Sequence, residues 1–137
     1  MNSYLSVKFQ GEDSEETVRE LITAIERTGF TVTAPVRDFD DFGRNNQDVT
    51  NLVPYMTNAL DHTDIVFVDA TDKGVGIGFE AGYAAANGIP VIVLHYGDSE
   101  ISPILELAAR RILPYNSYEE LYQQLETLKR TLEEEEV

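Results

Sequence analysis

The stretch IVFVDATDKGVGIGFEAGYAAANGIPVIVL, residues 65–94, decides the fold of this chain. It begins with a short β-branched and aromatic run at 65–68, which is typical of a buried strand. A glycine-rich turn follows, and the small residues at 81–87 favour a helix that ends at 88–90. Residues 91–94 form a second apolar run. The stretch therefore predicts strand, turn, helix and strand, with Glu80 in the first turn of the helix.

Hydrophobic periodicity predicts the same alternation along the rest of the chain. The other strands are expected at residues 4–9, 30–34 and 112–115, and the other helices at about 14–28, 48–62, 103–108 and 117–132. Alternating strands and helices imply a parallel sheet with right-handed crossovers. The economical architecture is a single flavodoxin-like α/β domain of five strands in the order 2-1-3-4-5. In that order the loops after Phe9 and after Asp69 converge at the carboxyl edge of the sheet, where ligands bind in such folds.

Residues 35–48 interrupt this alternation. The segment holds Asp38, Asp40 and Asp41 together with glycine and asparagine, and it has few apolar residues. It predicts a long polar loop that covers a site as a mobile lid.

Composition limits the classes of function. The 137 residues suit one domain over 1–132 with an acidic tail at 133–137. A formal net charge of -15 argues against binding to nucleic-acid polymers, because such binding needs cations that neutralise phosphates. The chain has no cysteine and no apolar run of the roughly 20 residues that span a bilayer. We expect a cytoplasmic protein without membrane association, metal or cofactor.

Glu80 is the main candidate for chemistry. An ionised carboxylate can displace a leaving group at the anomeric carbon of a sugar. A helix dipole at the first turn would keep the glutamate ionised. Gly74, Gly76 and Gly78 remove side chains where a ligand approaches the backbone, and they permit positive φ in the turn. The spacing also fits a glutamate that only favours the start of a helix. It does not match the dinucleotide or Walker motifs.

Residues 64–71, 74–84 and 88–91 together resemble the nucleoside 2-deoxyribosyltransferase family, which includes the 2′-deoxynucleoside 5′-phosphate N-hydrolases. The resemblance is strongest over residues 58–94. It implies that Glu80 attacks the anomeric carbon of a nucleoside or nucleotide, that the base leaves, and that water or a second base resolves the glycosyl-enzyme. It also implies a homodimer or larger homo-oligomer, because sites in this family border on subunit contacts.

The resemblance and the positions of the loops suggest a set of substrate-binding residues. Their members are Tyr4, Lys8, Phe9, Gln10, Gly11, Asn58, Asp69, Gly74, Gly76 and Gly78. Tyr4 and Phe9 are candidates for stacking on a base or sugar, with core packing as the alternative. Lys8 is a candidate partner for a 5′-phosphate, with an exposed lysine as the alternative.

One position departs from the family pattern. Family members usually carry Asp-Leu-Asn where this chain has Met56, Thr57 and Asn58, so an acid is lost. Either Asp61, Asp69 or a carboxylate of residues 38–41 substitutes for it, or turnover is weak or absent. The alternatives to an enzyme are a non-catalytic nucleotide- or metabolite-binding module and an acidic interaction domain. The second leaves the glycine-rich stretch unexplained.

Overall fold

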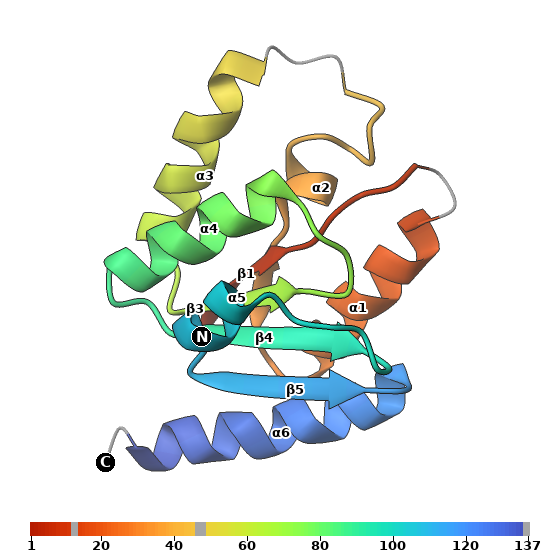
Figure 1. The fold of residues 1–137 in the computed structure, drawn as a ribbon, viewed down its shortest axis with the longest axis vertical. Coiled ribbons are helices and arrows are strands. Elements are labelled where there is room, and N and C mark those ends of the chain that lie inside the picture. Colours follow the sequence, from red (N-terminus) through yellow and green to blue (C-terminus); the bar gives the residue numbers. More distant parts are fainter. Residues whose placement is uncertain (12–13, 46–48, 136–137) are drawn as a thin grey trace.

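Five parallel strands form one central sheet in the computed structural model, which describes residues 1–11, 14–45 and 49–135 (Figure 1). The strands are β1 (Asn2–Ser6), β2 (Thr31–Thr33), β3 (Ile65–Asp69), β4 (Val91–Tyr96) and β5 (Arg111–Tyr115). The helices are α1 (Glu15–Arg27), α2 (Pro35–Asp38), α3 (Leu52–Asp61), α4 (Val75–Ala86), α5 (Pro103–Ala108) and α6 (Tyr118–Glu135), with a 3-10 turn at Val49–Asn51 before α3. The strand order is β2-β1-β3-β4-β5. The predicted flavodoxin-like fold is confirmed.

The register of the sheet fixes which side chains share a face. Ser6 of β1 lies beside Val68 of β3, and Asp69 lies beside Leu94 of β4. Because successive side chains of a strand point to opposite faces, Tyr4 and Ser6 share one face of β1. Asp69 ends β3 on the other face, the one that carries Phe67.

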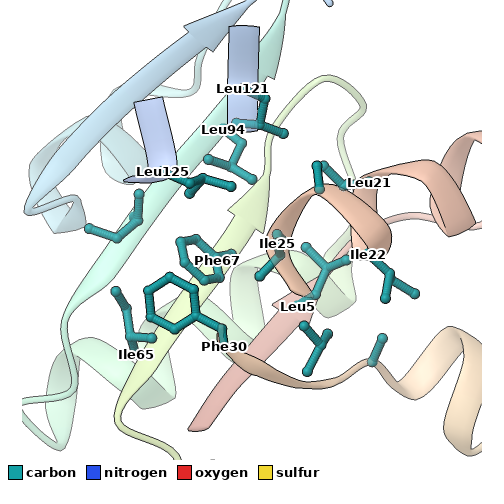
Figure 2. Close-up of a cluster of buried hydrophobic side chains, with 14 of the residues drawn as sticks. Leu5, Leu21, Ile22, Ile25, Phe30, Ile65, Phe67, Leu94, Leu121 and Leu125 are labelled. Atoms are coloured by element: carbon teal, nitrogen blue, oxygen red, sulfur yellow. The ribbon is translucent and has the colours of Figure 1, made fainter. Parts of the chain in front are cut away.

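One face of the sheet packs against α1 and α6. Leu21, Ile22 and Ile25 of α1 point toward the strands and meet Phe67 and neighbouring side chains (Figure 2). Leu121, Leu125, Leu128 and Leu132 recur along α6 at helical spacing, and all four are buried. This large apolar cluster anchors the sheet and leaves its carboxyl edge free for other functions.

The opposite face packs against α3, α4 and α5. Its cluster joins Tyr4 and Val68 of the sheet to Leu60 of α3 and to Ala81 and Ala84 of α4. The small alanines let α4 lie close to the strands. This close approach brings the side chains of α4 to the end of β1.

The segment at residues 35–45 differs from the predicted polar loop. It begins with the short helix α2, and Phe39 and Phe42 are buried with only 7% and 3% of their surfaces exposed. The Phe42 ring contacts Phe9 at a centroid distance of 5.8 Å and lies under the guanidinium of Arg19 at 4.4 Å. Residues 39–44 form turns and bends, as expected for a loop. The helix α2 and the two buried aromatic side chains were not expected, and they pack the segment against the rest of the domain despite its polar composition. Residues 46–48 of the expected lid lie outside the described part.

Several predicted boundaries also shift. The first strand ends at Ser6, so residues 7–10 belong to the loop at the carboxyl edge. Pro54 lies in the first turn of α3, where its missing N–H costs little. Helix α6 continues to Glu135 and includes most of the residues expected in an acidic tail. Within the described ranges, no helix has the length and apolar character needed to cross a membrane.

Candidate active site

Glu80 lies in the second turn of α4, which begins at Val75. The expectation that it occupies the first helical turn is wrong, because the glycine-rich stretch is itself helical from Val75 onward. The dipole effect is concentrated in the first turn, so it does not account for the state of this carboxyl group. The orientation and ionisation of the Glu80 carboxyl group must therefore depend on other contacts.

Two hydroxyl groups of β1 donate hydrogen bonds to the Glu80 carboxylate. Tyr4 Oη donates to Oε2, and Ser6 Oγ donates to Oε1 at 2.7 Å. All three side chains are buried, with exposed fractions of 0% for Tyr4, 1% for Ser6 and 7% for Glu80. The carboxylate is thus fixed in orientation, with both oxygens partnered on the side of the sheet.

Burial and hydrogen bonding act in opposite directions on the pKa of Glu80. Burial raises the pKa of the carboxyl group above its ordinary value, and the hydrogen bonds from Tyr4 and Ser6 partly oppose that rise by favouring the charged form. Burial and the neighbouring Glu80 charge also raise the pKa of the Tyr4 phenol, so its hydroxyl stays protonated and remains a donor. The site is therefore built to keep a desolvated carboxylate supplied with two donors.

A cavity of about 410 Å³ opens beside Glu80. Small-molecule sites commonly enclose about 300–1,000 Å³, so a nucleoside-sized ligand fits this scale. Three segments contribute most of the lining: the loop after β1, residues from Pro35 to Asp40, and the start of α4. Met56 and Leu52 of α3 add an apolar wall. The cavity lies at the carboxyl edge of the sheet near the junction of β1 and β3, as predicted from the strand order.

Gly74, which precedes α4, and Gly76 and Gly78 within it have different surroundings. Gly74 and Gly76 line the Glu80 cavity, and a Cβ at Gly76 would come within 3.9 Å of Glu80 Oε1. Gly78 lies instead in a groove between α4 and α5. None of the three has a positive φ, so the left-handed backbone that these glycines permit is not used. Gly74 and Gly76 leave space beside the carboxylate.

The loop after β1 contributes Lys8 and Phe9 to the same cavity. Lys8 is exposed, and Phe9 is half-buried against Phe42. Gln10 lines a second cavity of about 350 Å³ on the α1 side, which also includes Lys8. Gly11 has a φ of +97° and serves the turn into α1. Tyr4 is fully buried and contacts Glu80, so it has no open ring face for stacking.

Asp69 and Asn58 are not brought together with Glu80. Asp69 accepts hydrogen bonds from the Thr71 amide at 2.8 Å and from Tyr115 Oη at 3.1 Å, and it lines the second cavity. Strand alternation separates it from the face that carries Ser6. Asn58 is exposed on α3, where its carbonyl contacts His62 Nδ1. Neither residue lines the Glu80 cavity.

Sequence reasoning missed Ser6. The signal was weak: Ser6 follows Tyr4 by two residues and so lies on the same face of the strand, but β1 also carries the polar residues Asn2 and Ser3. Its role depends on where Glu80 arrives, which the local sequence does not specify. Within residues 1–11, 14–45 and 49–135, no group of three acidic, histidine or cysteine side chains could hold a metal ion.

The fold and the site define a class: a flavodoxin-like α/β domain with a buried, doubly hydrogen-bonded glutamate beside a cavity at the carboxyl edge of its sheet. The sequence profile of nucleoside 2-deoxyribosyltransferases matches residues 4–129 of the chain. This chain belongs to the nucleoside 2-deoxyribosyltransferase family. Comparison with curated proteins gives no match.

Solved structures share the fold at low sequence identity. The Clostridium botulinum CMP N-glycosidase BcmB is 19% identical, with a TM-score of 0.69 and coverage of 93% of this chain and 99% of that one. A 2-deoxyribosyltransferase from Bacillus psychrosaccharolyticus is 16% identical, with a TM-score of 0.72 and coverage of 89% and 90%. A conserved protein from Enterococcus faecalis is 16% identical, with a TM-score of 0.73 and coverage of 93% and 98%.

Proposed function

We propose that this protein cleaves or transfers the N-glycosidic bond of a nucleoside or nucleotide, with Glu80 as the nucleophile. The observation that carries this proposal is the Glu80 carboxylate, which lies beside a nucleoside-sized cavity and accepts hydrogen bonds from Tyr4 and Ser6. Membership of the nucleoside 2-deoxyribosyltransferase family supports the substrate class.

The proposed reaction proceeds by two displacements at the anomeric carbon. A Glu80 carboxylate oxygen forms a bond to C1′ while the C1′–N bond breaks and its electron pair leaves with the base. Water or a second base then attacks C1′, and the electron pair of the ester bond returns to Glu80. Two inversions give net retention at C1′, as in retaining glycosidases. Tyr4 and Ser6 orient the carboxylate and stabilise it when the ester breaks.

Base release tests the proposal. The substrates are a panel of ribo- and deoxyribonucleosides and their 5′-monophosphates, each with and without a second base. The wild type is compared with Glu80→Ala and Glu80→Gln. Loss of a buried nucleophile should abolish release. The matched control is Glu106→Gln, which makes the same change at an exposed position of α5 and should release base at the wild-type rate. Release that persists in both Glu80 variants would refute the proposed role.

A non-catalytic binding module is the second candidate. The observation that favours it is Met56, which is 6% exposed and presents an apolar wall to the cavity. Saturable nucleotide binding without base release from any member of the panel would support this alternative. In that case Glu80→Gln should change affinity, because the carboxylate would contact the ligand without reacting.

Lys8 gives the proposed site a means of selecting phosphorylated substrates. It is the one cation among the described residues that line the Glu80 cavity, in a chain with a net charge of -15. A 5′-phosphate near Lys8 would offset that field locally. The Lys8→Met variant should therefore lose preference for monophosphates over nucleosides while it keeps activity on nucleosides. An unchanged preference would remove Lys8 from substrate recognition.

We further propose that the protein is a homodimer or larger homo-oligomer that uses α4 and α5. These helices contact each other, and they expose Val75, Ile104 and Leu107 with 93%, 74% and 88% of their surfaces accessible. The groove between them is largely apolar. Such exposed apolar surface is typical of protein interfaces.

Sedimentation tests the oligomer. Leu107→Glu should shift the protein toward monomer, because it places a charge within the proposed interface. Gln123→Glu adds the same charge at an exposed position of α6 on the other side of the sheet and should leave the assembly unchanged. A monomeric wild type would refute this proposal.

A further inference from the structure

Asp40 carries a carboxyl group with no partner among the described residues. Its backbone is held firmly: its amide donates to the Pro35 carbonyl at 2.9 Å, and its carbonyl accepts from the Asn45 amide at 3.0 Å. Its side chain makes no hydrogen bond or ion pair within the described ranges. Its neighbours differ, since Asp38 pairs with Arg37 and Asp41 pairs with Arg44. Asp40 is therefore positioned by its backbone but left free to interact through its carboxyl group.

Asp40 lines the same cavity as Glu80, on a different segment of its wall. Lys8, Asp40 and Glu80 are the ionisable residues among those that line it. The same cavity is also lined by the apolar residues Pro35, Val36 and Met56. Burial in these apolar surroundings raises the pKa of the Asp40 carboxyl group above its ordinary value. A carboxyl group that holds its proton to higher pH is better suited to act as an acid.

The other carboxylates that could replace the family acid lost at Met56 have partners outside the Glu80 cavity. Asp61 accepts a hydrogen bond from Tyr83 Oη at 2.6 Å on the outside of α4. Asp69 is held by Tyr115 beside the second cavity. Asp38 accepts from the Ala34 amide at 2.9 Å as well as from Arg37. Of these groups, Asp40 alone shares the Glu80 cavity.

We propose, on the basis of the glycosidic function proposed above, that Asp40 is the catalytic acid that protonates the departing base. As the C1′–N bond breaks, its electron pair leaves with the base and an Asp40 oxygen gives its proton to a base nitrogen. Glu80 forms the ester to C1′ in the same step. In hydrolysis, the Asp40 carboxylate then takes a proton from the attacking water as the new C1′–O bond forms and Glu80 leaves. Atoms and protons balance, and Asp40 returns to its protonated form.

The dependence on the leaving group tests this role. Wild type, Asp40→Asn, Asp41→Asn and Glu80→Ala are assayed on the preferred natural substrate and on the matching sugar bearing 4-nitrophenolate, which leaves without a proton. Asp40→Asn should lose roughly 10²–10⁴-fold in rate on the natural substrate. On the nitrophenyl glycoside it should lose less than about tenfold in the first-turnover burst of nitrophenolate, which reports ester formation before Asp40 is needed as a base. Glu80→Ala should lose activity on both substrates.

Asp41→Asn is the matched control. It makes the same change at the next residue, which is exposed and has a φ of 45°, a conformation that asparagine tolerates. It should keep wild-type rates. Thermal unfolding of each variant checks that it folds.

The pH profile gives an independent readout of the acid. On the natural substrate, the wild-type rate should fall as pH rises through the Asp40 pKa, and this alkaline limb should vanish in Asp40→Asn. Equal losses of Asp40→Asn in the first turnover on both substrates, or no loss on either, would overturn the acid role while leaving Glu80 chemistry intact. A wild type that releases neither leaving group would overturn the proposed function and the role of Asp40 with it.

Discussion

The substitution Tyr4→Phe removes one of the two donors to Glu80 and leaves the rest of the side chain in place. Tyr4 is fully buried and Glu80 is only 7% exposed, so water cannot readily replace the lost hydroxyl. Ser6 remains at 2.7 Å from the other carboxylate oxygen. The charged form of Glu80 should therefore lose the contribution of one hydrogen bond while the protonated form loses less.

The expected size follows from the energy of that bond. A hydrogen bond to a charged group contributes about 1.5–3 kcal/mol. One pKa unit corresponds to about 1.4 kcal/mol, so the Glu80 pKa should rise by about 1–2 units in the variant. The acid limb of the rate profile should move to higher pH by the same amount, because the nucleophile must be ionised.

Carbon NMR of protein labelled at glutamate carboxyl groups measures this change without any need for activity. The Glu80 resonance is assigned by its loss in Glu80→Gln, and its titration is compared between wild type and Tyr4→Phe. Tyr83→Phe is the matched control. Tyr83 lies on α4, the helix that carries Glu80, and its hydroxyl donates a hydrogen bond to a different carboxylate, that of Asp61. The control should leave Glu80 unchanged. A Glu80 midpoint that stays the same or falls in Tyr4→Phe would refute the reasoning.

Three further predictions concern stability. Because its folded pKa is raised, Glu80 contributes stability below its ordinary pKa of 4.5, and this stability is lost as pH rises through the folded pKa. Glu80→Gln should therefore have a higher melting temperature than wild type at pH 8, with the difference shrinking below pH 4.5. Equal melting temperatures of the two proteins at both pH values would contradict this. Leu125→Ala, at a fully buried site of α6, should cost about 2–5 kcal/mol in chemical denaturation. Gln123→Ala, at an exposed site of the same helix, should cost less than about 0.5 kcal/mol. Phe42→Ala should cost about 3–5 kcal/mol if residues 35–45 are packed as observed, and an unchanged unfolding midpoint would instead indicate a detached lid.

Much of the fold follows from local patterns. The apolar runs at 65–68 and 91–94 are too short for helices and too apolar for loops, and the spacing of Leu121 and Leu125 is helical. Residues 35–45 were harder to predict, because their acidic composition resembles a loop. Phe42 becomes a core residue only when α1 and the loop after β1 are beside it, and the Phe39 ring packs against Tyr55 of α3.

The candidate site was predicted in part. Glu80 and the cavity near the β1 and β3 ends follow from the motif and the strand order. The partners of its carboxylate do not, because Tyr4 and Ser6 are 76 and 74 residues away in the chain. The expected helix-dipole effect was wrong because the helix starts five residues before Glu80.

The sequence by itself determined the order of strands and helices, the family and the residue most suited to be a nucleophile, since these depend on periodicity and on a contiguous motif. Only the tertiary structure decided which carboxylates share the Glu80 cavity. Asp69 is adjacent to that motif, yet strand alternation turns it to the other face of the sheet. Asp40 is 40 residues from Glu80 in sequence, and the fold places both in one cavity with Pro35 and Val36 of α2 and Leu5 of β1.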